Sequence, residues 1–168
     1  MPNPVELALK NTAAACNTLT TELASLNKRG KTRMTNYDNA CQMYYTSVDT
    51  IEELKKKAAK GKDPKADSEL KKWQGNHPAM GVRVKSTYAE LQVQREGLAQ
   101  AKKVVLAIGQ AIDKVNKLAA RTATIDVDES SSELQTEVQT MASSLKAASK
   151  EITRMEKLLD DLPNLPRL

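Results

Sequence analysis

The sequence has very few of the side chains that usually fill a compact core or an active site. Its 168 residues include no phenylalanine, one tryptophan and one histidine, and aromatic residues make up only 3%. A compact globule of this length normally uses large rings for core volume, whereas helices can pack through Leu, Val, Ile, Ala and Met alone. The shortage of aromatic residues therefore favours long helices that pack side by side.

The scarcity of histidine and cysteine argues against metal and haem sites. The single histidine, His77, precedes Pro78, so the paired Glu-x-x-His motifs of di-iron bundles are missing. Cys16 and Cys41 lack the Cys-x-x-Cys spacing that is typical of zinc sites and of c-type haem attachment. We therefore predict no metal ligands and no cofactor.

Catalytic constellations are incomplete as well. The sequence contains no glycine-rich phosphate loop and no Gly-x-Ser-x-Gly motif. A pair formed by Cys41 and His77 would need a thiol that faces inward on a helix to meet a residue of a linker. We therefore predict no catalytic residues, no small-molecule substrate and no enzymatic activity.

What the sequence does contain is apolar residues at alternating spacings of three and four. They occur in four stretches, over residues 5–26, 34–58, 84–119 and 134–159. A mean repeat of 3.5 residues places these side chains in one seam along a helix, which is typical of helices that pack along their whole length. We therefore predict an all-α protein with four long helices.

Helix-breaking residues indicate how the first two helices connect. Asn3 and Pro4 predict a helix start, with Asn3 as the N-cap. Gly30 predicts a turn, and Gly61 predicts the end of the second helix. Because the turn is short, residues 4–60 are expected to form an antiparallel hairpin.

The second half of the chain is expected to form another hairpin, over residues 80–161. Glycine and proline residues interrupt the pattern in a crossover linker at 61–79, where Asp63 predicts the N-cap of a short helix. The tail at 162–168 contains two prolines and is expected to be extended. Residues 1–168 are thus predicted to form one domain, an elongated antiparallel four-helix bundle or coiled coil of two hairpins joined by a linker containing a short helix.

Positive charge gathers where the first turn is predicted, in a chain with a formal net charge of +5. Lys28, Arg29, Lys31 and Arg33 surround Gly30, so we expect four cations at one hairpin tip. Such a tip can dock on an acidic surface. Nucleic acid is an unlikely partner, because no aromatic residues alternate with these cations and no base-reading motif is present.

Trp73 is a further candidate for partner binding, since a lone tryptophan on a linker helix needs apolar neighbours. These features predict a non-enzymatic helical interaction or structural protein, such as an adaptor, a chaperone, an immunity protein or a secretion-system component. Its partner is expected to be another protein or a second copy of itself. The alternative is a membrane-active helical protein, such as a toxin or a translocator component, that exposes Val104–Ile112 at a membrane surface without spanning it.

The apolar runs of the sequence are short. The longest, Val104–Ile112, is about half of the roughly 20 residues that a spanning helix needs. Near the N-terminus, Glu6 and Lys10 interrupt what would be the apolar core of a signal peptide. We therefore expect a soluble, cytoplasmic protein, and leave export by a route without a cleaved signal open.

Overall fold

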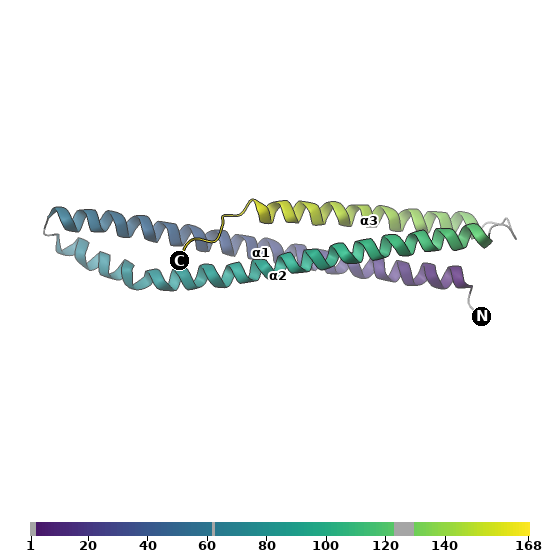
Figure 1. The fold of residues 1–168 in the computed structure, drawn as a ribbon, viewed down its shortest axis with the longest axis horizontal. Helices are drawn as coiled ribbons and strands as arrows, with labels where there is room; N and C mark the ends of the chain where they lie inside the picture. The colour runs from purple at the N-terminus through teal and green to yellow at the C-terminus, as the bar shows by residue number, and fades with distance from the viewer. Residues whose placement is uncertain (1–2, 62, 123–129) are drawn as a thin grey trace. The chain divides into compact units, whose positions relative to one another are not determined.

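The computed structural model describes residues 3–61, 63–122 and 130–168, and every regular element in this part of the chain is a helix. Helix α1 spans Pro4–Lys60, α2 spans Pro64–Thr122 and α3 spans Ser130–Asp160 (Figure 1). The predicted all-α class is confirmed. The second predicted hairpin requires a loop, predicted at Thr122–Glu129. Thr122 is the last residue of α2, and the rest of this loop lies outside the described residues.

The first two helices begin at the predicted N-caps. The side chain of Asn3 accepts a hydrogen bond from the backbone N–H of Val5 at 3.0 Å. The side chain of Asp63 accepts one from the backbone N–H of Lys65, also at 3.0 Å. In both helices a proline follows the cap, at the position where its missing N–H costs least.

The turn predicted at Gly30 is wrong, because α1 continues through this residue. Steps of four, three and four residues lead from Leu26 through Gly30 and Arg33 to Tyr37, which is fully buried. Glycine in a helix interior costs about 1 kcal/mol relative to alanine, and tertiary packing commonly outweighs such a preference. One long helix therefore replaces the hairpin predicted over residues 4–60.

The linker predicted at 61–79 is also wrong, because α2 begins at Pro64 and continues through Gly75 and Pro78. Proline inside a helix removes a hydrogen bond at a cost of about 3 kcal/mol, yet the spacing of three and four persists across it. The seam residues in this part of α2 are all buried or half-buried, and they are Ala66, Leu70, Trp73, His77, Met80 and Val84. The predicted short helix and third helix are therefore a single helix, and the described residues form three helices where the sequence predicted four long helices and a short one.

The chain divides into two compact units, each of which uses part of α1 and part of α2. Unit 1 consists of Met1–Lys28 and Arg95–Leu158. Unit 2 consists of Arg29–Gln94 and Leu159–Leu168. The single domain expected over residues 1–168 stays a prediction.

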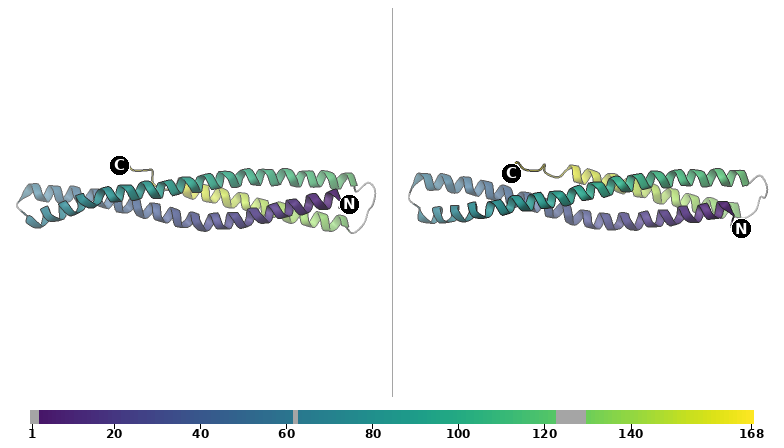
Figure 2. Two further views of the ribbon diagram at one scale, coloured as in Figure 1. Left: turned by 90° about the horizontal axis from the view of Figure 1, so that it is seen from below. Right: turned by 60° about the horizontal axis from the view of Figure 1, so that its bottom comes forward.

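Unit 1 is a bundle of three helices, and both views in Figure 2 show α3 beside α1 and α2. The thiol of Cys16 lies 4.0 Å from the carbonyl oxygen of Met141, and the side chain of Asn27 donates a hydrogen bond to Glu151 at 2.6 Å. Residue numbers rise together in these two contacts, so α1 and α3 run parallel. The seam residues that close the core of unit 1 include Leu19, Leu98, Ile108, Val115, Ile152 and Met155.

Unit 2 is an antiparallel pair formed by α1 and α2, with the C-terminal tail (residues 161–168) packed on it. Contacts between the two helices match rising numbers in α1 with falling numbers in α2. They join Arg33 to Gln94, Tyr37 to Tyr88, and Ser47 to His77. Besides α1 and α2, the described residues of unit 2 include the last two residues of α3 and the tail, and no third helix runs beside the pair.

Two glycines of α2 test the continuity of this helix. We expect Gly75→Ala to raise the free energy of unfolding by about 0.5–1 kcal/mol, because alanine favours a helix interior and a Cβ at Gly75 would meet nothing within 4 Å. Gly97→Ala is the matched control. A Cβ at Gly97 would lie 2.8 Å from Leu26 Cδ1, so Leu26 must move and we expect no gain.

Urea unfolding followed by circular dichroism measures both variants. If Gly75→Ala destabilised the protein, the helix would end near this glycine, as the sequence predicted, and the continuous α2 would be contradicted.

Candidate interaction surfaces

The four cations predicted to form a hairpin tip lie within the continuous helix α1. Lys28 belongs to unit 1, whereas Arg29, Lys31 and Arg33 belong to unit 2. Lys28 and Lys31 are three positions apart and so lie on one side of the helix, whereas Arg29 is turned by about 100° from Lys28. Because α1 continues through Gly30, no hairpin tip forms here. A role of these four cations in partner binding stays a prediction.

Arg33 differs from the other three cations because it occupies a seam position in unit 2. Its guanidinium donates a hydrogen bond to the side-chain oxygen of Gln94 at 2.8 Å, and Gln94 is fully buried. Arg33 itself is half-buried. The buried amide of Gln94 thus accepts a hydrogen bond from a charged donor, and such charge-assisted hydrogen bonds are among the stronger ones in proteins.

Trp73 lies on α2 and not on a separate linker helix. It is a seam residue of unit 2, one turn after Leu70, and both side chains are only half-buried. A role for Trp73 in partner binding stays a prediction, and its half-exposed ring is consistent with that role.

Unit 2 also contains a serine–histidine pair that sequence reasoning missed. Ser47 Oγ lies 2.9 Å from Nδ1 of His77, and the ring of Tyr44 lies against the imidazole with centroids 4.8 Å apart. Serine and histidine are two members of a catalytic triad, but Ser47 is fully buried and its hydroxyl cannot reach a substrate. The contact instead gives two polar side chains of the seam a hydrogen-bond partner. Because both residues occupy seam positions, the spacing of the sequence could have predicted this pair.

Tyr37 and Cys41 form a buried polar contact one turn apart on α1. Burial, followed by the hydrogen bond with Cys41, raises the pKa of Tyr37 well above its usual range. Burial likewise raises the pKa of Cys41, although its side-chain interaction with Tyr37 acts in the opposite direction. Both groups are neutral near pH 7, so Cys41 is a thiol and not a nucleophilic thiolate.

The C-terminal tail is held against unit 2 by backbone contacts to two tyrosines. The hydroxyl of Tyr37 donates a hydrogen bond to the carbonyl of Pro163 at 2.9 Å. The hydroxyl of Tyr44 donates one to the carbonyl of Arg167 at 3.4 Å. Pro166, which lies between these two tail residues, is buried. As expected from its prolines, the tail contains no further helix.

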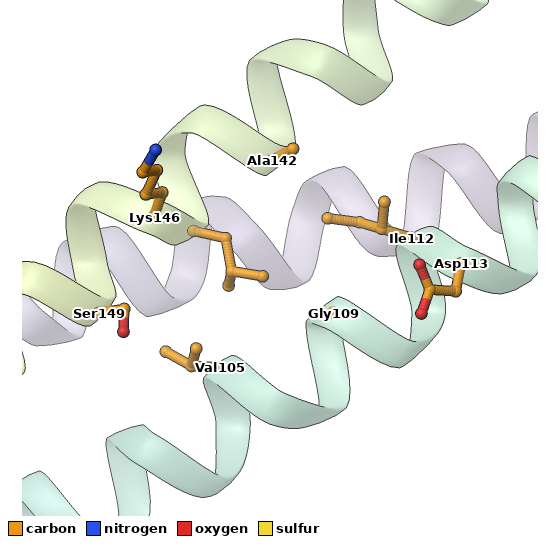
Figure 3. Close-up of a pocket in the computed structure, with 8 residues that line it drawn as sticks. Val105, Gly109, Ile112, Asp113, Ala142, Lys146 and Ser149 are labelled. Atoms are coloured by element: carbon orange, nitrogen blue, oxygen red, sulfur yellow. The ribbon is translucent and has the colours of Figure 1, made fainter.

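Unit 1 contains a groove of about 430 Å³ between α2 and α3 (Figure 3). Asp113 on α2 and Lys146 on α3 are its charged residues. Gly109 deepens it, because a Cβ there would stand 3.6 Å from Leu145 Cδ2. The residues that line the groove are Val105, Gly109, Ile112, Asp113, Ala142, Leu145, Lys146 and Ser149. Such a mostly apolar groove suits an apolar side chain better than a polar substrate.

Among the described residues, no group of three or more His, Cys, Asp or Glu side chains could hold a metal ion. None of the described helices has the length and apolar character that crossing a bilayer requires. Comparisons with protein-family models, with curated proteins and with solved structures found no match for this chain.

The buried thiols and the buried phenol predict that the protein is destabilised at alkaline pH. Folding raises the pKa of Cys16, Cys41 and Tyr37, so these groups lose protons more readily in the unfolded chain. We expect the free energy of unfolding to fall as the pH rises above about 9, by up to about 1.4 kcal/mol per pH unit for each group that is ionised only in the unfolded chain.

Urea unfolding at a series of pH values measures this slope. Cys41→Ala should make it shallower, whatever its effect at neutral pH. A slope that is the same in both proteins would contradict the shielding of the Cys41 thiol.

Proposed function

We propose that this chain is a non-enzymatic helical interaction protein that binds a helix of a protein partner along the α1–α2 pair of unit 2. The observation that carries the proposal is the incomplete burial of the seam in this unit. Ile51, Leu70, Trp73 and Met80 occupy seam positions, and each is only half-buried. Two packed helices cover the inner side of such residues and leave their flanks in contact with water.

The seam of unit 1, where a third helix is present, supports this interpretation. Leu19, Leu98 and Ile108 are 2%, 1% and 3% exposed, although the seam residues Val105 and Leu145, which line the groove, are half-buried. A partner helix on unit 2 would complete the burial of its seam in the same way. Completing the burial of each large apolar side chain would contribute about 1 kcal/mol.

The charge around the half-buried seam indicates the chemistry of this partner. Residues 50–75 contain eight lysines and five acidic residues. A partner helix with acidic residues beside its apolar stripe would complement this excess of positive charge. A second copy would bring the same excess and meet like-charge repulsion.

Site-specific photocrosslinking in the source cell tests the proposal. A diazirine-bearing side chain replaces Leu70, which is half-buried in the seam of unit 2. The matched control carries the same group in place of Leu106, which is 65% exposed in unit 1. We expect a protein adduct at position 70 and none at position 106.

Mass spectrometry of the adduct identifies the crosslinked peptide, and we expect an acidic amphipathic helix. Equal labelling at both positions, or labelling at position 106 alone, would contradict binding along unit 2.

The membrane-active alternative stays a prediction. It requires Val104–Ile112 to become exposed, whereas Ile108 and Ile112 are buried in unit 1. Release of a trapped dye from liposomes, increasing with protein concentration, would favour this alternative over the proposed function.

A further inference from the structure

The C-terminal tail contacts unit 2 in a manner that indicates a recognition site. The tail offers backbone carbonyls, and the helices offer side-chain donors, from Tyr37 to Pro163 and from Tyr44 to Arg167. Carbonyls along an extended, proline-containing backbone are free to accept such bonds, because this backbone makes no internal hydrogen bonds. Aromatic side chains that bind proline-rich segments use the same physical principle.

The prolines of the tail prepare it for this kind of contact. Pro163 and Pro166 fix their own φ angles and favour extended conformations in the residues before them. They also have no N–H, so the segment cannot extend α3. Less conformational entropy is therefore lost when the tail docks, which favours binding of a short segment.

The receiving surface consists of Tyr37, Tyr44 and Gly81, and we call it the tail-binding face. Tyr37 is fully buried and Tyr44 is 8% exposed, so both hydroxyls are held by packed rings. At Gly81 an added Cβ would stand 3.7 Å from Leu168 Cδ2 and 3.9 Å from the Tyr44 ring. Leu168 and Tyr44 therefore lie close to this glycine, at distances where an added methyl group would make ordinary contacts with both.

The fit of the tail to this face is incomplete. The hydrogen bond from Tyr44 to Arg167 is long, at 3.4 Å. Leu165 and Leu168 are 40% and 46% exposed, so much of their apolar surface stays in contact with water. A segment that buried two such leucines more fully would compete with the tail.

We infer that the tail-binding face is a docking site for an extended, proline-containing apolar segment of a partner protein, and that the C-terminal tail occupies it in the free chain. The inference rests on the proposed function, in that the chain acts by binding protein. The partner segment would present a buried proline, flanking carbonyls for the two tyrosines and a leucine above Gly81. The tail then acts as a competitor within the same chain.

A labelled peptide with the sequence Leu-Pro-Asn-Leu-Pro-Arg-Leu tests the site by fluorescence anisotropy. We expect saturable binding to a chain that ends at Asp161. The full chain should bind the peptide at least tenfold more weakly, because its own tail competes at an effective concentration on the order of millimolar. Circular dichroism checks that the shortened chain keeps its helices.

Variants of the shortened chain distinguish specific binding at the tail-binding face from nonspecific binding of the peptide. Tyr44→Phe keeps the ring and removes the hydroxyl, so we expect about threefold to tenfold weaker binding. Tyr45→Phe, at the adjacent exposed tyrosine, is the matched control and should bind the peptide normally. A peptide with alanine in place of both prolines should bind more weakly than the original. The inference would be overturned if the shortened chain stayed helical and did not bind the peptide. It would also be overturned if neither Tyr44→Phe nor the loss of both prolines changed the affinity.

A measurement on the full chain decides the question if the shortened chain loses its helices. Carboxypeptidase should release Leu168 and Arg167 more slowly while the hydrogen bonds from the two tyrosines hold the tail. We expect added unlabelled peptide to speed this release, and Tyr44→Phe to speed it more than Tyr45→Phe. A release rate that does not respond to the peptide would overturn the inference.

The outcome is separable from that of the proposed function. Failure of the peptide experiments would leave crosslinking at Leu70 unaffected, whereas the absence of a protein adduct at Leu70 would leave peptide binding unaffected.

Discussion

The alternation of three and four residues between core positions is the constraint on which these helices depend. In α1 it continues without a shift of phase from Val5 to Ala58, and in α2 from Ala66 to Ala119. A seam of this length makes the helical state cooperative, since a break at any one point would rotate all later side chains out of register. The accumulated burial therefore outweighs the local costs at Gly30 and Pro78.

Polar residues within the seam determine how α1 aligns with α2. Ser47 meets His77 and Arg33 meets Gln94 across the pair in unit 2. No buried side-chain nitrogen or oxygen in the described part of the chain lacks a hydrogen-bond partner. A shift of one helix along the other would bury some of these groups without partners, at about 1–3 kcal/mol each. The polar positions therefore favour one alignment of α1 against α2, whereas an apolar seam alone would tolerate several.

The sequence was a good guide to features set by nearby residues and a poor one to features set by distant residues. Its apolar period predicted the helices, and Asn3 and Asp63 marked two helix starts correctly. Gly30 and Pro78 were misread because each has a strong local preference, while the seam that overrides it extends over many turns. The error at Gly30 then placed four cations at a tip, although the structure puts them along one helix.

Contacts between residues far apart in the sequence could not be predicted, for a different reason. Tyr37 and Pro163 are separated by 126 positions, and no periodic pattern links them. The sequence identified the two tyrosines as seam residues and the tail as a proline-containing segment. Nothing in it indicated that the tail packs against the tyrosines. The Ser47–His77 pair was closer to being predictable, because both residues fall in phase with the apolar positions around them.

The distribution of aromatic residues has a consequence for spectroscopy. All five aromatic side chains, Trp73 and four tyrosines, lie between Tyr37 and Tyr88 and so within unit 2. Near-ultraviolet absorption and emission therefore come from unit 2 alone, while the far-ultraviolet signal sums over every helix. The chain thus carries an intrinsic optical label that distinguishes the melting of unit 2 from that of unit 1 without any added dye.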